Sequence, residues 1–284
     1  MTVFDAILLG LIQGLTEFVP VSSTAHLTLA GKLMGLIDSR NLAAWTEFMA
    51  VVQMGTLAAV MLYFSKEMIA MMTGVATDIR SKLMGNRLQN RSDHAKTGWF
   101  VLMGTLPVAI MGLLFSRQIH GWFTKSTPVI IASLIVLATL LWLAEKVARH
   151  IRTLENFTLQ DAFIIGVAQA MALVPGSSRS GTTITAGLFL SFTRESAARF
   201  SFLLSIPAVL ASGVYEFLKF DGEVAQMGYG NLVIATLVAG VSGYAAIAWL
   251  LKYLSRNSTM LFVWYPIALG IVLILLLRFD LIQP

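Results

Sequence analysis

The chain contains no cysteine and few charged residues. The absence of cysteine from its 284 residues excludes disulfide bonds and thiolate metal sites. Asp, Glu, Lys and Arg together make up 12% of the chain, whereas hydrophobic residues make up 57% and the mean hydropathy is +0.77. A water-soluble domain of this length needs much more polar surface. We therefore predict an all-α integral membrane protein that comprises a single membrane domain, residues 1–284.

A signal-peptide pattern is also missing. The first apolar segment has no basic residues ahead of it and no small-residue cleavage site after it, so we expect it to remain in the folded protein. The net charge of +5 is modest. In a membrane protein, Lys and Arg indicate topology rather than a nucleic-acid surface, so we expect the bilayer and no nucleic acid as a partner.

Six apolar runs are long enough to cross a hydrocarbon core about 30 Å thick. They lie near 46–64, 99–117, 128–147, 197–218, 231–251 and 261–278. Two further runs, near 3–19 and 161–174, end in proline and a polar cluster, and resume as short apolar pieces near 27–37 and 182–192. Each half is too short to span, and a polar break cannot face lipid. The pattern predicts six transmembrane helices and two re-entrant helix–loop–helix hairpins.

The distribution of basic residues predicts the orientation. Six crossings place both termini on one side, so the loops 65–98, 148–160 and 252–260 share the other side. These loops carry most of the Lys and Arg residues, among them Arg80, Lys82, Arg87, Arg91 and Arg152. Positive charge accumulates on cytoplasmic loops, so we expect periplasmic termini in a multi-pass protein of the bacterial inner membrane.

An internal repeat relates the two predicted hairpins. DAILLGLIQ (5–13) recurs as DAFIIGVAQ (161–169) at an offset of 156, and PVSS (20–23) matches PGSS (175–178) after a one-residue slip. Extended self-similarity of this kind is typical of duplicated membrane folds, here about 1–117 and 157–252, although chance similarity between hydrophobic helices is the alternative. Three predicted crossings separate the hairpins, so the second copy is inverted and the two polar tips are expected to meet near the midplane.

The first polar tip reads QGLTEFVPVSSTAH, residues 13–26. Gln13 and Glu17 are four residues apart and share one helix face. An ionised carboxylate in a membrane needs a cation, so Glu17 is expected to bind a metal ion or to pair with an arginine; a protonated, structural Glu17 is the alternative. The hydroxyls of Ser22 and Ser23 either contribute to a site or cap the next helix, and His26 supplies an imidazole.

The second polar tip reads PGSSRSGTT, residues 175–183. Its glycines allow the backbone to approach an anion, and Arg179 can clamp a phosphate with two parallel hydrogen bonds. The hydroxyls of Ser178, Ser180 and Thr183 add donors. The alternative is a turn whose arginine extends to the lipid headgroups. Together, the tips suit phosphoryl transfer on an amphiphilic substrate, because a cation and Arg179 neutralise phosphoryl charge while a hydroxyl or water attacks.

These motifs resemble one known family. The stretch QGLTEFVPVSSTAH is similar to the Glu/Gln-x-x-x-Glu and Pro-Val-Ser-Ser-Thr-x-His motifs of the bacterial undecaprenyl-diphosphate phosphatases, the bacitracin-resistance family, and LVPGSSRSGTT resembles their Pro-Gly-x-Ser-Arg-Ser-Gly motif. The resemblance covers nearly the whole chain. It implies an inverted-repeat membrane enzyme that removes the terminal phosphate from a C55 isoprenoid diphosphate, needs Mg²⁺ or Ca²⁺, opens to the periplasm, recycles the carrier lipid and confers bacitracin resistance. The resemblance is also compatible with a homodimer.

The resemblance also assigns roles. It places Glu17 as the principal anionic metal ligand, with Gln13, where some members have a second glutamate, as a neutral oxygen ligand or a residue that positions water and binds substrate. Arg179 is expected to clamp the phosphate, and Ser23 to act as the nucleophile or to orient water. His26 is expected to be the acid/base partner, or the nucleophile itself. The remaining substrate-binding candidates are Ser22, Ser178, Ser180, Thr183 and, on an early span, Gln53.

Two other classes compete with this reading. Inverted repeats with broken helices are common in secondary transporters, so a lipid transporter or flippase without hydrolysis is the alternative function. Ser23 and His26 beside Glu17 favour an enzyme, because transport needs no nucleophile. The type-2 phosphatidate phosphatases also use a Ser-Arg pair, but their Pro-Ser-Gly-His motif and its downstream His-x-x-x-Asp partner are missing here.

Overall fold

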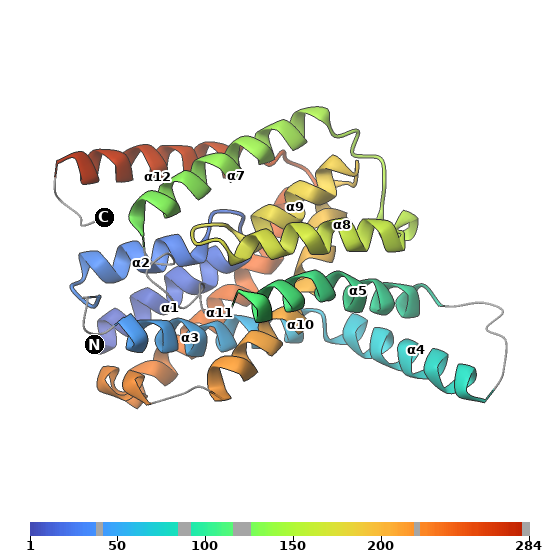
Figure 1. The fold of residues 1–284 in the computed structure, drawn as a ribbon, viewed down its shortest axis with the longest axis horizontal. Coiled ribbons are helices and arrows are strands. Elements are labelled where there is room, and N and C mark those ends of the chain that lie inside the picture. The colour runs from blue at the N-terminus through green and yellow to red at the C-terminus, as the bar shows by residue number, and fades with distance from the viewer. Residues whose placement is uncertain (38–41, 85–91, 116–125, 219–221, 280–284) are drawn as a thin grey trace.

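The computed structural model describes residues 1–37, 42–84, 92–115, 126–218 and 222–279 (Figure 1). Within these ranges the chain forms α-helices and short 3-10 turns and contains no β-strand, which confirms the all-α class. The α-helices are α1 (Val3–Glu17), α2 (Ser23–Leu33), α3 (Leu42–Tyr63), α4 (Ser65–Leu83), α5 (Asp93–Leu114), α7 (Thr127–Val147), α8 (Leu159–Ala170), α9 (Arg179–Phe189), α10 (Arg194–Leu218), α11 (Tyr229–Leu254) and α12 (Leu261–Arg278).

Six of the described helices are long and apolar enough to cross a membrane: α3, α5, α7, α10, α11 and α12. Each predicted apolar run overlaps one of them, so the six runs are confirmed as helices able to span a membrane, and the chain is a multi-pass membrane protein with six candidate spans. The largest shift is at α5, which begins at Asp93 because the Ser92 side chain accepts a hydrogen bond from the Ala95 N–H and caps the helix. Large apolar side chains cover the outer surface; Val241, for example, is 75% exposed, as suits contact with lipid.

The predicted loop 65–98 contains an additional helix, α4, which is separated from the end of α3 by one residue and packs along α5. Its composition is too polar to predict a span, so the apolar pattern did not reveal it. Trp99 Nε1 of α5 donates to Asp78 Oδ2 of α4 at 3.1 Å, and Asp78 is buried between the two helices. Arg80 and Lys82 lie in the last turn of α4, whereas Arg87 and Arg91 lie outside the described residues.

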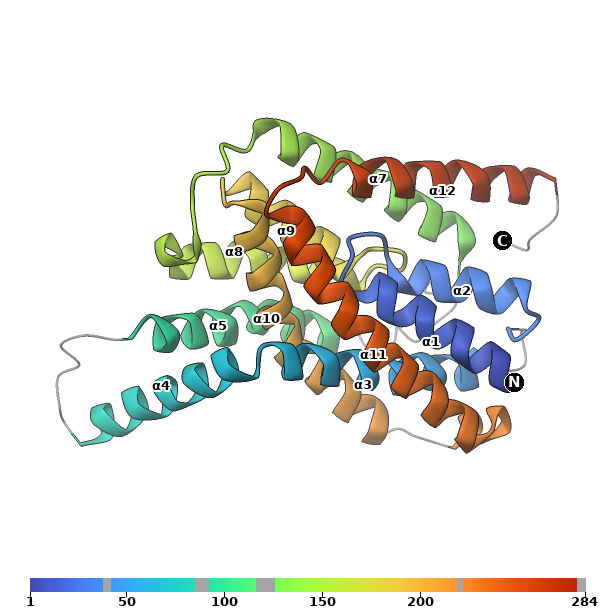
Figure 2. The same cartoon turned by 180° about the vertical axis from the view of Figure 1, so that it is seen from behind.

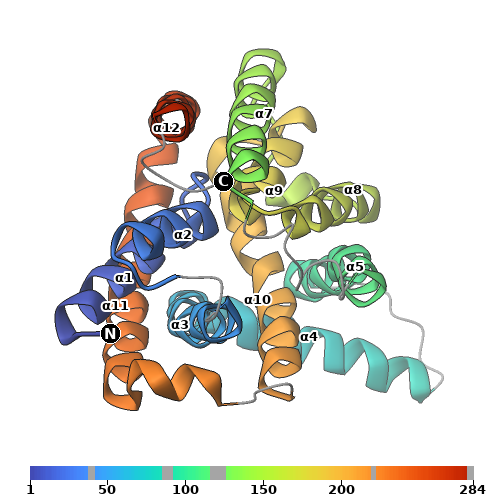
Figure 3. The same cartoon turned by 60° about the vertical axis from the view of Figure 1, so that its left-hand side comes forward.

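Two helical hairpins approach the centre of the molecule from opposite ends (Figures 1 and 2). The first consists of α1 and α2, and α1 starts at the end that carries the N-terminus. The second consists of α8 and α9 and starts at the opposite end. The turns of the two hairpins therefore lie next to each other in the middle of the bundle, where the second turn also packs against α7 (Figure 3).

Local capping explains why both hairpins break where they do. Thr2 and Thr158 each form a capping box, with Asp5 and Asp161 respectively, and start α1 and α8. Ser22 caps α2, and its counterpart Ser178 caps α9. Thr2 and Thr158 are 156 positions apart, and so are Ser22 and Ser178. The capping residues therefore follow the repeat offset of 156, and the one-residue slip falls in the turns before α2 and α9.

The first helix of each hairpin packs closely on a distant span. α1 lies along α11, and α8 lies along α5. A Cβ atom added at Gly14 of α1 would lie 2.6 Å from the Ala239 carbonyl oxygen of α11, and one added at Gly166 of α8 would lie 2.3 Å from the Gly104 carbonyl oxygen of α5. Real Cβ atoms do not come this close to a backbone oxygen, so glycine is required for these helices to approach each other.

Two buried ion pairs stabilise the end of the molecule at which the second hairpin starts. Arg194 of α10 forms hydrogen bonds with Glu145 of α7. Arg152 binds Asp161, the capping-box residue of α8, at 2.6 Å. Burial raises the pKa of the Asp161 carboxyl, but the hydrogen bonds from Arg152 and Thr158 outweigh burial and hold this pKa below its usual value. These contacts fix the position from which the second hairpin enters the bundle.

Candidate active site

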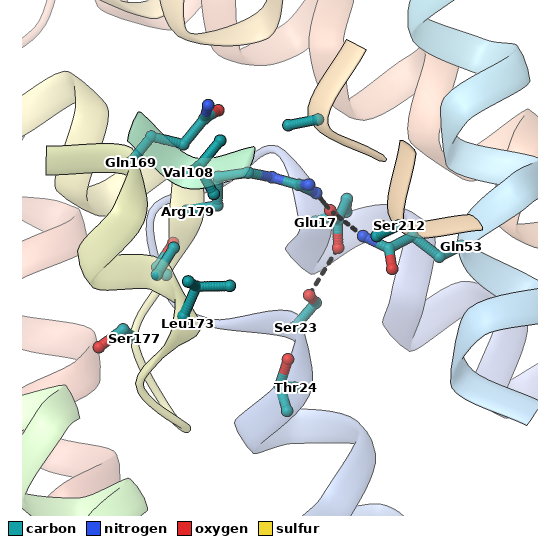
Figure 4. Close-up of a pocket in the computed structure, with 13 residues that line it drawn as sticks. Glu17, Ser23, Thr24, Gln53, Val108, Gln169, Leu173, Ser177, Arg179 and Ser212 are labelled. Atoms are coloured by element: carbon teal, nitrogen blue, oxygen red, sulfur yellow. Dashed lines mark hydrogen bonds and ion pairs between the residues drawn. The ribbon is translucent and has the colours of Figure 1, made fainter. Parts of the chain in front are cut away.

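Glu17, the last residue of α1, is the centre of a buried polar cluster (Figure 4). Its side chain is 6% exposed. Oε1 accepts hydrogen bonds from the guanidinium of Arg179 and, at 3.3 Å, from Gln53 Nε2 of α3. Oε2 accepts from Gln13 Nε2 at 3.0 Å and from Ser23 Oγ at 2.6 Å. Four donors thus surround this buried carboxylate, and the structure pairs Glu17 with an arginine.

Arg179 is the first residue of α9, directly after the second turn. The turn is tight because Gly176 adopts a φ of +80°, and a Cβ atom there would lie 2.7 Å from Ile130 Cα. Ser178 caps the helix by accepting a hydrogen bond from the Gly181 N–H at 3.0 Å. The positive end of the α9 dipole and the Arg179 guanidinium therefore lie at the same place, next to Glu17. Such an arrangement attracts anions.

Ser180 and Thr183 hold the two turns in place and do not line the main polar cavity of the described chain. Ser180 Oγ donates to the Val19 carbonyl oxygen of the first turn at 3.2 Å. The fully buried Thr183 hydroxyl donates to the Arg179 carbonyl oxygen at 2.8 Å and lies 2.6 Å from Ser201 Oγ of α10. The structure thus gives both hydroxyls a role in positioning Arg179.

A cavity of about 250 Å³ opens beside the ion pair. Glu17 and Arg179 lie on its wall together with apolar side chains from α5 and α10. Its other polar lining residues are Ser23, Thr24, Gln53, Gln169, Ser177, Ser178 and Ser212. Hydroxyls, amides, one carboxylate and one guanidinium therefore face one small space that lies between the two hairpins.

The two serines of the first turn differ in their surroundings. Ser22 caps α2, and its Oγ accepts a hydrogen bond from the Ala25 N–H at 3.3 Å. Its φ of 71° is uncommon for a non-glycine residue and indicates local backbone strain next to Ser23. Ser23 lines the cavity and donates its hydroxyl proton to Glu17 Oε2. Ser23 is therefore the hydroxyl with an adjacent proton acceptor, whereas Ser22 shapes the turn.

His26 lies one turn further along α2, and its ring makes two contacts. Nδ1 lies 2.7 Å from the Ser22 carbonyl oxygen, to which it donates, and Nε2 lies 2.7 Å from the Tyr265 hydroxyl of α12. The two rings are stacked, with centroids 5.6 Å apart. Among the described residues His26 does not line the polar cavity, and both ring nitrogens are occupied. In this state His26 supports the strained turn at Ser22.

Gln169, at the end of α8, also lines the cavity, and the sequence analysis did not select it as a site residue. It is fully buried, and its amide nitrogen and oxygen have no hydrogen-bond partner among the described residues. A buried amide without partners is costly and suggests a missing ligand. The internal repeat could have identified Gln169 as a site residue, because Gln169 is the counterpart of Gln13 at the offset of 156.

The residues present are compatible with a divalent cation bound together with a phosphate. No group of three or more His, Asp or Glu side chains that could hold a metal ion occurs in the described ranges. Mg²⁺, however, is commonly bound by one or two carboxylates plus substrate phosphates and water. Glu17 would supply the carboxylate, and Gln13, which donates to Glu17 from behind the described lining of the cavity, would supply an amide oxygen.

The six apolar spans and the buried cavity define a polytopic helical membrane protein with an acid–guanidinium–hydroxyl site inside the bundle. Residues 6–272 match the sequence model of a protein family described as bacitracin resistance protein BacA. The chain belongs to this family, so the resemblance stated from the sequence motifs is confirmed.

Curated relatives align with almost the whole chain. A protein of Syntrophobacter fumaroxidans is 51% identical over 271 residues, which cover 95% of this chain and 95% of the relative. A protein of Myxococcus xanthus is 47% identical over 100% of this chain and 92% of its own length, and one of Chloroherpeton thalassium is 45% identical over 100% and 99%. All three relatives are named undecaprenyl-diphosphatase.

Proposed function

We propose that this chain is an undecaprenyl-diphosphatase, a membrane hydrolase that converts undecaprenyl diphosphate into undecaprenyl phosphate and inorganic phosphate. The activity recycles the lipid carrier for cell-wall synthesis and underlies bacitracin resistance. Membership of the family and the names of full-length relatives support the assignment. The single observation that carries it is the contact of Glu17 in the first hairpin with Arg179 in the second, beside a cavity that Ser23, a hydrogen-bond donor to Glu17, also lines.

The diphosphate replaces Glu17 as the anionic partner of Arg179. The guanidinium and the N-terminus of α9 neutralise the phosphoryl charge, and Gln53 and the hydroxyl of Ser178 add donors at the cavity wall. Thr183 and Ser180 keep Arg179 at the turn through their contacts with its carbonyl oxygen and with the first hairpin. Binding thus exchanges one ion pair within the protein for one between protein and substrate.

Ser23 is the proposed nucleophile. Its Oγ attacks the terminal phosphorus while its proton passes to Glu17 Oε2, to which it already donates at 2.6 Å. The bond from this phosphorus to the bridging oxygen breaks, and undecaprenyl phosphate leaves. Water then attacks the phosphoserine, the Ser23 Oγ–phosphorus bond breaks, and Oγ recovers the proton from Glu17. Direct attack by water and a phosphohistidine at His26 are the alternative routes.

Glu17 and Gln13 are the proposed ligands of a divalent cation, Mg²⁺ or Ca²⁺. With Arg179 turned to the phosphate, Glu17 Oε1 would keep only the Gln53 donor and could face a cation, and Gln13 lies on the same face of α1. When bound, the ion would neutralise the developing charge on the diphosphate oxygens. We expect chelation with EDTA to abolish phosphate release, and added Mg²⁺ or Ca²⁺ to restore it.

The proposed function implies a particular arrangement of the hairpins and the termini in the membrane. The two hairpins are re-entrant and belong to inverted repeats, about 1–117 and 157–252, which meet at the cavity. The opposed entry of the hairpins and the caps spaced 156 residues apart support this arrangement. The termini and the opening of the site face the periplasm, as the basic loops predict. A homodimer remains compatible with this arrangement.

Phosphate release from undecaprenyl diphosphate by the purified, detergent-solubilised protein tests the function. Wild type is expected to be active, and Glu17→Gln and Arg179→Ala are each expected to lose activity by about 10³-fold or more, because each leaves the other charge unpaired. Glu67→Gln and Arg199→Ala are matched controls, since this pair of the same residue types is partly exposed and 3.8 Å apart. Full activity of either site variant would contradict the shared site.

The same assay distinguishes the nucleophiles and the transporter alternative. Rapid acid and alkaline quenches with ³²P-labelled substrate should trap an acid-stable phosphoenzyme that maps to Ser23 and is absent from Ser23→Ala. A phosphohistidine at His26 would replace Ser23 in the scheme, and no phosphoenzyme would favour water. A lipid transporter would release no phosphate in detergent, where no membrane separates two compartments.

A further inference from the structure

We propose that the groove between α5 and α10 binds the first isoprene units of the lipid chain whose diphosphate occupies the polar cavity. This groove is a second cavity of about 250 Å³. Its walls are largely apolar and include Val108, Ala109, Gly112, Leu113, Ala208 and Ala211; its polar lining residues are Thr105, Ser212, Tyr215 and Glu216. The inference rests on the proposed function and adds to it the position of the substrate chain.

The groove adjoins the polar cavity and shares part of its lining. Val108 of α5, Leu173 after α8, and Ala208 and Ser212 of α10 line both spaces. A ligand with its anionic group beside Arg179 and an attached apolar chain can therefore extend from one space into the other without crossing a helix. Ligand sites generally combine a few polar groups with an apolar wall, and this pair of cavities separates the two along one path.

The far side of the groove is suited to contact with lipid. Leu113 of α5 is 70% exposed, and Leu210 and Val214 of α10 are 48% and 52% exposed. Because α5 and α10 are membrane spans, these side chains face hydrocarbon. A C55 chain is much larger than the groove, so the groove holds the units nearest the diphosphate, and the remainder of the chain lies among the lipids.

Both helices carry a proline at the point where the two cavities meet. Pro107 precedes Val108 in α5, and Pro207 precedes Ala208 in α10. Proline lacks a backbone N–H and interrupts the regular helix at this level. Further along α5, a Cβ atom added at Gly112 would meet no atom within 4 Å, so the space beside Gly112 is open. A side chain placed there would enter the groove rather than the protein core.

A larger apolar cavity elsewhere in the bundle is a less suitable binding site for the isoprenoid chain of the substrate. It has a volume of about 490 Å³ and lies between α1, α11 and α12. Its lining, which includes Val19, Val21 and Ala245, has no residue in common with the described lining of the polar cavity. The first turn separates it from Arg179, because Val19 and Val21 belong to that turn. It therefore provides a control position for the experiment.

Filling the groove tests the inference. Gly112→Leu is expected to raise the KM for undecaprenyl diphosphate at least tenfold, while hydrolysis of isopentenyl diphosphate, which has one isoprene unit, changes less than twofold. Gly230→Leu, at another helix position with no atom within 4 Å, and Ala245→Leu, in the larger cavity, are expected to resemble wild type. An unchanged KM for Gly112→Leu, or a rise for Ala245→Leu instead, would overturn the assignment of the groove.

Thiol protection provides a second test that does not depend on turnover. The chain has no native cysteine, so Ala211→Cys and Ala245→Cys each introduce a single thiol. Undecaprenyl phosphate should slow the alkylation of Ala211→Cys by N-ethylmaleimide at least threefold, and inorganic phosphate should not. Protection of Ala245→Cys alone, or of neither thiol, would contradict the groove. Failure of wild type to release phosphate from undecaprenyl diphosphate would instead contradict the proposed function.

Discussion

Each oxygen of the Glu17 carboxylate accepts two hydrogen bonds, and the four donors come from three separate parts of the chain. This arrangement keeps a buried charge stable in a bundle surrounded by lipid. The amide of Gln169, in contrast, is buried but forms no hydrogen bond within the described ranges. The contrast suggests that Gln169 is arranged for a ligand rather than for the stability of the fold.

A Gln169→Leu substitution tests this role. Leucine has a similar size and removes the unpartnered amide, so the melting temperature should stay the same or rise. If the amide binds a phosphate oxygen, kcat/KM for undecaprenyl diphosphate should fall by about tenfold or more, because a hydrogen bond to a charged group contributes about 1.5–3 kcal/mol. Gln169→Glu should lower activity further by adding negative charge. A purely structural Gln169 would show a lower melting temperature and an unchanged kcat/KM.

At the scale of elements, the site depends on how closely α1 and α8 approach their partner spans. Each turn is a short break between two helices, α1 and α2 or α8 and α9. The contacts at Gly14 and Gly166 fix α1 against α11 and α8 against α5, and the capped starts of α2 and α9 then orient Ser23 and Arg179. The precision of the site is therefore set by backbone packing at some distance from it.

We expect Gly166→Ala to separate α8 from α5. The added Cβ would lie 2.3 Å from the Gly104 carbonyl oxygen, and overpacking of this kind costs about 1–3 kcal/mol. The melting temperature and kcat should both fall, since α8 leads into the turn that carries Arg179. Gly230→Ala is the matched control, because no atom lies within 4 Å of the position of its Cβ. Equal melting temperatures for the two variants would show that the close approach is not required.

At the scale of the whole molecule, polar turns from opposite ends of the bundle form one cavity, and apolar spans surround them. In the proposed mode of binding, the cavity and the adjoining α5–α10 groove form one path from a charged site to the lipid-facing surface. This architecture suits a substrate with a diphosphate at one end and a long isoprenoid chain at the other. The orientation of the protein in the membrane then determines from which side of the membrane the diphosphate reaches the site.

Single cysteines can determine that orientation, because the chain has no native cysteine. Glu155, in the loop before α8, and Glu223, in the turn before α11, are both exposed and lie on either side of the span α10. In spheroplasts, a membrane-impermeant maleimide should label Glu223→Cys, and should label Glu155→Cys only after the membrane is permeabilised. The reverse pattern would place the termini in the cytoplasm, and labelling of both from outside would contradict the number of spans.

The sequence by itself determined the apolar spans, the caps and the two polar turns, because these depend on neighbouring residues. Six apolar runs correspond to six long helices. Capping boxes at Thr2 and Thr158 follow from residues three positions apart. The polar helix α4 was missed, since no apolar run marks it and its packing on α5 stabilises it instead.

Only the tertiary structure decided which side chains share the site. It placed Arg179, 162 residues away along the chain, against Glu17, and joined Ser23 to the same carboxylate. It also directed His26 to Tyr265 and left the Gln169 amide unpartnered beside the cavity. Local sequence cannot specify these contacts, because they depend on how closely whole helices pack, and that distance is set by backbone contacts between α1 and α11 and between α5 and α8.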